Sequence, residues 1–422
     1  MSTQDIIQTI AIMLGAGLVS ELLANALRLP QMLVLLGAGA ILGPYVAGWL
    51  DPPLDSVGIQ LLLTLGVSFI LFNGGLGLSV RVLQKVAIGL GLLVIPGVLI
   101  TAVITGAAAA PAFGLSYQEG LLIGAVLAAT DPAILIPLFE WLPVRKKVVQ
   151  TIIAESAFND VTSAVLSLTL AAFVLEGDGS LTSPLFEFVT DLAISTALGV
   201  LFGVLLAIVI SNHRLGIWRE FPAVASLLVV STGYFSIDSA GGSGYLGAFL
   251  AGLIVANMDV LGLGMHSKHE EQLRSFVDVV ADVVVIFVFV TLGANLPFDQ
   301  FGEYALPALA TLAVFIFVAR PVTVVASLAP DRRGDWSRSE IAFMAWVRET
   351  GVVPAAVAGL LVAKGISIGD QLVTTVALAI VVTLLVQATT KPWLARRLGL
   401  YEAEASSAAG EELAEPQSSS TT

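Results

Sequence analysis

Long apolar stretches follow one another along almost the whole chain, separated by short polar segments. A helix needs about 20 mainly apolar residues to cross a bilayer, and stretches of that length predict thirteen membrane-spanning helices. They lie at residues 5–27, 31–49, 57–79, 86–112, 118–139, 147–175, 187–211, 220–237, 242–261, 273–294, 301–328, 339–362 and 370–394. The pattern predicts an all-α, multi-pass protein of the cell membrane.

The composition fits this interpretation and excludes several other classes of protein. Hydrophobic residues make up 57% of the 422-residue chain and charged residues only 12%, whereas soluble domains carry roughly 25% charged residues. The lack of cysteine excludes a disulfide framework, cysteine-ligated zinc and thiol catalysis. None of the three histidines stands with paired carboxylates at a metal-ligand spacing. We expect no enzymatic activity, no bound cofactor and no nucleic-acid partner.

The charges between the apolar stretches indicate how the chain is oriented. Sixteen of the nineteen Lys and Arg residues fall in alternate connections, including Lys391, Arg396 and Arg397 near the end of the last stretch. Because basic residues concentrate in cytoplasmic loops, we predict that the N-terminus lies outside the cell and the C-terminus inside. The Ser-, Ala- and Glu-rich segment 401–422 is typical of a disordered acidic tail.

Six charged residues lie well inside the predicted fifth, sixth, eleventh and twelfth spans, where an unpaired charge costs about 2.5–3.5 kcal/mol on insertion scales. They are Asp131, Glu155, Asp160, Arg320, Arg348 and Glu349. Four acids and two bases cannot neutralise one another completely, so at least two carboxylates are left over. A surplus carboxylate in a low-dielectric site can exchange a proton for a metal cation. That is the chemistry of an antiporter, whereas a purely structural ion-pair network needs no surplus.

Two of the spans carry helix-breaking residues beside these charges. In "LAATDPAILIP" (127–137), Pro132 lacks an N–H group and disfavours helix at the residue before it. In "AWVRETGVVPAAVAG" (345–359), Gly351 and Pro354 follow a charged pair. The two segments belong to the fifth and twelfth spans, which hold the same position, in opposite directions, in two six-span repeats. Matched broken helices indicate an inverted-repeat transporter, so we predict two broken helices that cross.

The stretch "IIAESAFNDVTSAV" (152–165) places polar side chains on two faces of one helix. Ser156 and Asp160 lie four residues apart and share a face. Glu155 and Asn159 share the adjacent face. Asp160 projects beside a hydroxyl group and is therefore the candidate exchange carboxylate.

Two motifs on consecutive spans resemble the cation/proton antiporter-1 family, the NhaP-type sodium/proton exchangers. The first is "TDP" at 130–132, and the second has the form "ESxxND" at 155–160. The resemblance extends over essentially the whole chain up to the tail and implies a homodimer. Within a transmembrane domain at 1–400, it implies two parts. They are a dimerisation part at about 1–79 and 220–294, and a mobile ion-carrying core at about 86–211 and 301–397.

The resemblance also implies roles for individual residues. Asp160 would bind either the cation or the proton. Thr130, through its backbone carbonyl, and Ser156 would complete the coordination of Na⁺, with Asp131 close by. Asn159, directly before Asp160, is the mark of electroneutral, one-for-one exchange.

A structural ion pair and two departures complete the comparison with the family pattern. Glu155 would be paired with Arg320 of "FVARPVTV". Many relatives carry an acid in the "F-x-G-G" motif of the third span, where this chain has Asn73. Relatives often read Arg-Gly in the twelfth span, where this chain has Arg348-Glu349. We hypothesise that Glu349 takes over part of the charge balance that is missing at Asn73.

The sequence therefore predicts electroneutral Na⁺/H⁺ exchange by alternating access, with a role in pH homeostasis. A K⁺/H⁺ antiporter of the same fold is the alternative, because the sequence does not fix the size of the cavity or the number of ligands. An ion channel would need a continuous filter, and the sequence has no repeated carbonyl-ring motif. An intramembrane aspartyl protease would need two catalytic aspartates on facing helices. Asp131 and Asp160 satisfy that count but lack the sequence contexts of such proteases.

Overall fold

Helices account for the secondary structure of the chain in the computed structural model, which describes residues 3–131, 144–176 and 182–401. Within those ranges there is no strand, and Val144 and Tyr401 form an isolated antiparallel bridge. The expected all-α architecture is therefore confirmed. The acidic tail from residue 402 onward lies outside the described residues, whereas Tyr401, placed at its start by the sequence analysis, pairs with Val144.

The first half of the chain supplies eight described helices. They are α1 (Thr3–Leu27), α2 (Gln31–Leu42), α3 (Val57–Leu76), α4 (Val80–Val94), α5 (Pro96–Phe113), α6 (Tyr117–Leu127), α8 (Lys146–Glu176) and α9 (Thr182–Ile210). The second half continues with a further group of helices and three short helical segments. They are α10 (Pro222–Ser239), α11 (Gly244–Ala256), η1 (Met258–Leu261), α12 (Ser267–Ala294), α13 (Phe301–Val314), η2 (Phe315–Ala319), α14 (Arg320–Leu328), α15 (Arg338–Trp346), α16 (Val352–Ala363), α17 (Gly369–Val382), η3 (Thr383–Gln387) and α18 (Ala388–Arg397).

Within the described residues, each predicted apolar stretch contains one helix or consecutive helices. Among the described residues, eight helical segments are long and apolar enough to cross a membrane, and α2, α11 and α16 are shorter apolar helices. The count of thirteen spans and the outward N-terminus stay predictions. The stretch 86–112 is divided where Pro96 begins α5, because proline cannot donate a backbone hydrogen bond to the preceding turn.

Both predicted interruptions occur in helices that begin with a strong start signal. A capping box of Ser116 and Glu119 begins α6, and one of Ser337 and Glu340 begins α15. Helix α6 ends at Leu127, and the following residues up to 131 are not helical. Pro132 and the rest of the predicted fifth span to 139 lie outside the described residues. In the twelfth span, five residues (347–351) separate α15 from α16.

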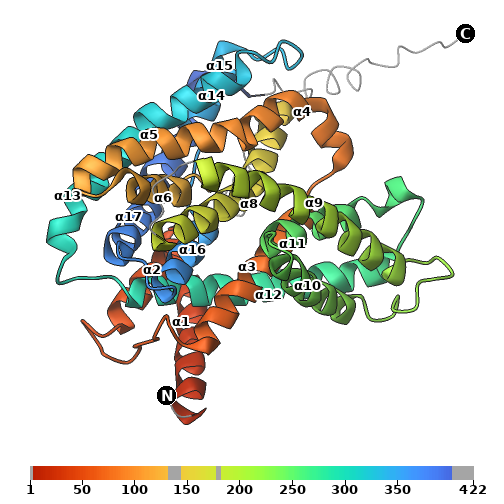
Figure 1. Ribbon diagram of the computed structural model, residues 1–422, viewed down its shortest axis with the longest axis horizontal. Coiled ribbons are helices and arrows are strands. Elements are labelled where there is room, and N and C mark those ends of the chain that lie inside the picture. Colours follow the sequence, from red (N-terminus) through yellow and green to blue (C-terminus); the bar gives the residue numbers. More distant parts are fainter. Residues whose placement is uncertain (1–2, 132–143, 177–181, 402–422) are drawn as a thin grey trace, which may run out of the picture.

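Helices α6, α8, α16 and α17 all supply buried apolar side chains to the main core, and α8 and α16 lie in the middle of the molecule (Figure 1). Buried apolar side chains of α3 and α12 join the same core. Helices α9, α10 and α11 pack together on one side (Figure 1). Gly75 of α3 and Gly252 of α11 let two backbones touch, because a Cβ at either position would collide with a carbonyl group of the other helix.

Candidate ion-binding site

Asp160 lies in the interior of the protein, on the central helix α8. Its side chain is buried, and its Oδ1 accepts a hydrogen bond of 3.0 Å from the backbone N–H of Thr130. The donor belongs to the non-helical segment after α6, which is free to donate because that helix has ended. Asp131 and Arg348 both lie close enough to act electrostatically on Asp160. The structure thus brings the candidate carboxylate to the first interruption.

Asp131 connects the two interruptions. Its N–H donates to the carbonyl oxygen of Glu349 at 3.1 Å, and its Oδ2 accepts from the N–H of Val352 at 3.1 Å. Val352 is the first residue of α16, so the carboxylate sits at the positive end of that helix. Gly351 leaves the necessary space, because a Cβ there would overlap the Asp131 carboxylate. Asp131 of the first interruption thus contacts the second interruption, whereas the crossing of two broken helices stays a prediction because the fifth span beyond Asp131 lies outside the described residues.

Arg348 stands at the opposite helix end. Its guanidinium group donates to the carbonyl oxygens of Leu127, at 3.5 Å, and of Ala128. These carbonyl groups end α6, where the helix dipole favours a positive charge. The same guanidinium group lies 4.9 Å from the ring centroid of Phe315. The first interruption therefore places a negative side chain, Asp131, at the N-terminus of α16. The second places a positive side chain, Arg348, at the C-terminus of α6.

Glu155 and Arg320 form a buried, two-pronged ion pair between α8 and α14. One prong joins Nη2 to Oε2 at 3.0 Å, and the other joins Nη1 to Oε1. Arg320 also donates to the carbonyl oxygens of Met344, at 3.1 Å, and Val347, at 3.2 Å, at the end of α15. Asn159 donates from Nδ2 to Oε1 of Glu155 at 3.3 Å. The two residues that share a helix face in the sequence thus share a hydrogen bond.

Lys391 is a charged residue of the site that the sequence analysis assigns wrongly. It was counted among the cytoplasmic charges, but its side chain is fully buried and forms an ion pair with the equally buried Glu349. The signal was available in the spacing of Thr383, Gln387 and Lys391, which places three polar residues on one side of the last predicted span. The positive-inside rule assigns basic residues near helix ends to cytoplasmic loops, so it does not recognise a lysine that is buried inside the protein.

The other two residues of that series contact the second interruption and the end of the helix before it. Thr383 Oγ1 accepts from the N–H of Thr350 at 3.2 Å, and Gln387 Nε2 donates to the carbonyl oxygen of Trp346 at 2.8 Å. Both belong to η3, a π-helical segment between α17 and α18. A second π-helical segment, η2, directly precedes Arg320. Such segments frequently occur at functional sites, and here both face the break between α15 and α16.

These contacts define a group of seven buried charged side chains, here called the central charge group. Its members are Asp131, Glu155, Asp160, Glu349, Arg320, Arg348 and Lys391. The group contains four carboxylates and three cationic side chains, so one carboxylate is in surplus when all are ionised. The surplus of at least two expected from the sequence is wrong, because that count leaves out Lys391. Glu349 is balanced by Lys391 within this group.

Oxygen atoms near Asp160 could serve a cation. Thr130 Oγ1 and Asn159 Oδ1 are buried and have no hydrogen-bond partner in the part of the chain that is described. Ser156 is also buried, one helical turn before Asp160 on α8. No cluster of three His, Asp or Glu side chains suited to a metal ion occurs in ranges 3–131, 144–176 and 182–401. One carboxylate with neutral oxygens suits a hard, singly charged cation.

Asn73, the departure in the third span, is engaged elsewhere. Its Nδ2 donates to Oδ1 of Asp278 on α12 at 3.0 Å, and its side chain is half-buried. The charge balance proposed between Asn73 and Glu349 gains no support from any contact between these two residues in the described chain.

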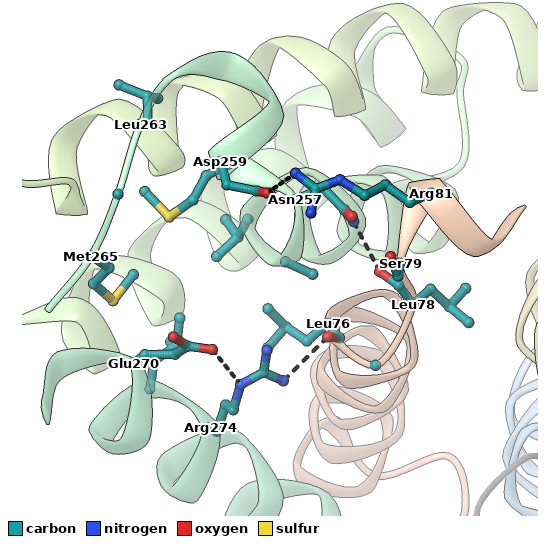
Figure 2. A pocket seen from close by; sticks show the side chains of 16 residues that line it. Leu76, Leu78, Ser79, Arg81, Asn257, Asp259, Leu263, Met265, Glu270 and Arg274 are labelled. Carbon is teal, nitrogen blue, oxygen red and sulfur yellow. Dashed lines mark hydrogen bonds and ion pairs between the residues drawn. The ribbon is translucent and has the colours of Figure 1, made fainter. Parts of the chain in front are cut away.

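A cavity of about 530 Å³ lies at a different place, where α3, α4, α11 and α12 meet (Figure 2). Arg81 pairs with Asp259 at 2.7 Å on one side, and Arg274 pairs with Glu270 at 3.0 Å on the other. Asn257 contacts the backbone between α3 and α4. No member of the central charge group lines this cavity.

Comparison with known proteins places the chain among membrane transporters. The family described as "Sodium/hydrogen exchanger, transmembrane" matches residues 10–397. The K⁺/H⁺ antiporter NhaP of Alkalimonas amylolytica is 28% identical over 354 residues, covering 83% of this chain and 59% of that protein. The probable Na⁺/H⁺ antiporter 2 of Methanocaldococcus jannaschii is 29% identical, covering 83% of each. The K⁺/H⁺ antiporter NhaP2 of Shewanella sp. strain ANA-3 is 31% identical, covering 86% of this chain and 62% of that protein.

A solved structure shares the fold. The sodium proton antiporter MjNhaP1 from Methanocaldococcus jannaschii, determined at pH 8, superimposes with a TM-score of 0.81 and 26% sequence identity. The match covers 93% of this chain and 99% of that one. The chain spans less than two thirds of the length of the two curated K⁺/H⁺ antiporters compared above.

Proposed function

The chain belongs to the sodium/hydrogen exchanger family, and on that premise we propose that it exchanges a monovalent cation for a proton across the cell membrane. The antiporter fold of its structural neighbour and the antiporter names of its relatives support this proposal. The exchange moves ions without altering covalent bonds, so the proposal includes no enzymatic step. The proposed exchange would serve pH homeostasis.

The observation that carries the proposal is the single surplus carboxylate of the central charge group. Glu155 is paired with Arg320 and Glu349 with Lys391, while Asp131 sits at the N-terminus of α16. Asp160 instead accepts the backbone N–H of Thr130, whose buried Oγ1 has no hydrogen-bond partner among the described residues. A bare carboxylate is costly in a low-dielectric interior. The carrier therefore crosses the barrier only when Asp160 holds one proton or one monovalent cation, and this restriction couples the two fluxes one for one.

We assign the ligands of the cation as follows. Asp160 binds it directly, and Ser156 and the backbone carbonyl of Thr130 add neutral oxygens. Asp131 holds the interruption in place through α16. Asn159 adds no charge to the site, in keeping with electroneutral exchange, and its amide is oriented by Glu155.

The proposed moving parts follow the division expected from the sequence. Residues at about 86–211 and 301–397 form the ion-carrying core, and those at about 1–79 and 220–294 form the dimerisation part of a homodimer. Helix α9 lies at this boundary, because it packs most extensively on α11 and α10 while also contacting α8.

Na⁺ is the proposed substrate, with K⁺ as the second candidate. The motif around Asp160 resembles that of sodium/proton exchangers. Two of the relatives compared above are named K⁺/H⁺ antiporters, which is the specific observation in favour of K⁺.

The test is cation-driven proton flux in proteoliposomes that contain a pH-sensitive dye. Li⁺, Na⁺ and K⁺ are compared for the wild type, Asp160→Asn and the control Asp299→Asn, which alters an exposed loop residue bonded to Tyr45. We expect flux with Na⁺ that is lost in Asp160→Asn and retained in the control. Flux with K⁺ alone would change the substrate and keep the mechanism. A folded wild-type protein without flux under any gradient would overturn the proposal.

A further inference from the structure

We propose that Glu349 and Lys391 are a positioning pair that sets the cation affinity of Asp160 from the last helix of the chain. This inference rests on the proposed function and assigns a role to two residues that do not touch the cation. Lys391 belongs to α18, whereas Glu349 belongs to the interruption between α15 and α16.

A continuous series of contacts joins this pair to Asp160. The carboxylate of Glu349 is paired with Lys391, and its backbone carbonyl oxygen accepts the N–H of Asp131 at 3.1 Å. The residue before Asp131 is Thr130, whose N–H donates to Asp160 Oδ1 at 3.0 Å. A displacement of Glu349 would therefore move the backbone donor that holds the exchange carboxylate.

The interruption depends on such external ties because, among the described residues, helical hydrogen bonds reach only its two ends, from the N–H of Val347 and to the carbonyl oxygen of Gly351. Arg320 holds its start through the carbonyl oxygen of Val347. Thr383 holds its end through the N–H of Thr350. The ion pair with Lys391 holds the residue between them, which is the one that contacts Asp131.

Burial makes each charge of the Glu349–Lys391 ion pair dependent on its partner. Both side chains are 0% exposed, and among the described residues neither Glu349 oxygen nor Lys391 Nζ has a hydrogen-bond partner outside the ion pair. An unpaired buried charge is strongly destabilising. Each charge therefore requires the other at a fixed place. A pair of well-packed apolar residues can match a buried ion pair in stability, so stability alone does not explain why a charged tie stands here.

A second buried glutamate, on the helix before the interruption, provides the matched control. Glu340 of α15 is also buried and pairs with Lys147 at 3.1 Å and Arg145 at 3.4 Å. Its other contacts go to Ser337 at the start of the helix. It therefore resembles Glu349 in burial and charge but has no contact with the interruption.

The experiment measures the Na⁺ concentration for half-maximal proton flux, together with the maximal rate, in proteoliposomes. The variants are Glu349→Gln, Lys391→Met, the double variant that carries both, and the control Glu340→Gln. Na⁺-induced stabilisation against thermal unfolding gives a second readout that needs no transport. Size-exclusion profiles establish that each variant is folded.

We expect each single variant to raise the half-maximal Na⁺ concentration about tenfold or more, because misplacing a site by about 1 Å can cost as much. The maximal rate should change less. The double variant leaves no unpaired charge, so it should fold, yet it should still require about threefold more Na⁺ or more because the tie is gone. The control should keep the wild-type concentration. Where a single variant does not fold, the double variant carries the test.

Two results would overturn the inference. One is an unchanged half-maximal concentration in folded single variants. The other is a double variant with wild-type affinity, which would make the pair a neutral structural unit. Failure of the proposed function looks different, because the wild type itself would then show no flux. If Na⁺ still stabilised that protein through Asp160, the thermal readout would decide the inference; if it did not, both proposals would be wrong.

Discussion

Residue 351 has room for a hydrogen atom and for nothing larger. Gly351 lies against the Asp131 carboxylate at the start of α16, and a Cβ would overlap it. The close approach allows that carboxylate to accept the N–H of Val352. The lack of a side chain at Gly351 is therefore needed for the position of the Asp131 carboxylate.

Gly351→Ala tests this close approach. We expect a loss of stability of about 1–3 kcal/mol, the usual cost of overpacking, and a higher Na⁺ concentration for half-maximal flux. Gly91→Ala in α4 is the control, because no atom lies within 4 Å of the added Cβ. That change should be neutral or stabilising by about 0.5–1 kcal/mol. Equal effects of the two substitutions on thermal unfolding would contradict the steric argument.

The pair of Glu155 and Arg320 permits a second prediction for single residues. Removing one partner leaves a buried charge, so Glu155→Gln should reduce stability by about 3–5 kcal/mol. Arg81→Gln, which breaks an exposed pair with Asp259, should cost less than about 1 kcal/mol. Thermal unfolding in detergent measures both. An equal loss of stability in Glu155→Gln and Arg81→Gln would contradict the view that Glu155 and Arg320 depend on each other as a buried ion pair.

Among the elements, the interrupted helices account for the site. α6 ends and α16 begins beside one another, so a carbonyl-rich end and an N–H-rich end face the same region. Arg348 occupies the first and Asp131 the second. The sequence predicts these breaks well, because proline and glycine act locally on the backbone.

Other features of the elements could not be predicted. No local pattern in the sequence marks the π-helical segments η2 and η3. Lys391 was missed for a related reason, because its partner Glu349 lies 42 positions earlier and only the fold brings them together. By contrast, Glu155 and Asn159 were placed on one face because a single helix fixes their spacing.

The link between α3 and α4 carries a prediction at the scale of elements. Asn257 accepts the N–H of Val80 at 2.8 Å and donates to the carbonyl oxygen of Leu78 at 2.8 Å. Asn257→Ala leaves both backbone groups without this partner and should cost about 1–3 kcal/mol. The change Asp259→Asn two residues later, which affects only an exposed pair with Arg81, should have little effect on the melting temperature. Similar melting temperatures for the two variants would show that Asn257 does not fasten the link.

For the whole molecule, the balance of buried charge matters more than any single contact. In the central charge group, four acids and three bases leave one carboxylate to be neutralised by a proton or by a singly charged cation. The sequence predicted the exchange chemistry but gave too large a surplus. Dimer formation and the identity of the cation depend on a second chain and on cavity dimensions, which a linear pattern does not encode.

The central claim is that one cation replaces one proton at Asp160, and its most direct test is electrical. Na⁺-driven proton flux is measured in proteoliposomes with the membrane potential set by a K⁺ gradient and valinomycin, in parallel with the current that follows a Na⁺ concentration jump. One-for-one exchange predicts flux that is independent of the potential and no transport current. A current that requires Asp160, with flux that changes with the potential, would contradict the account.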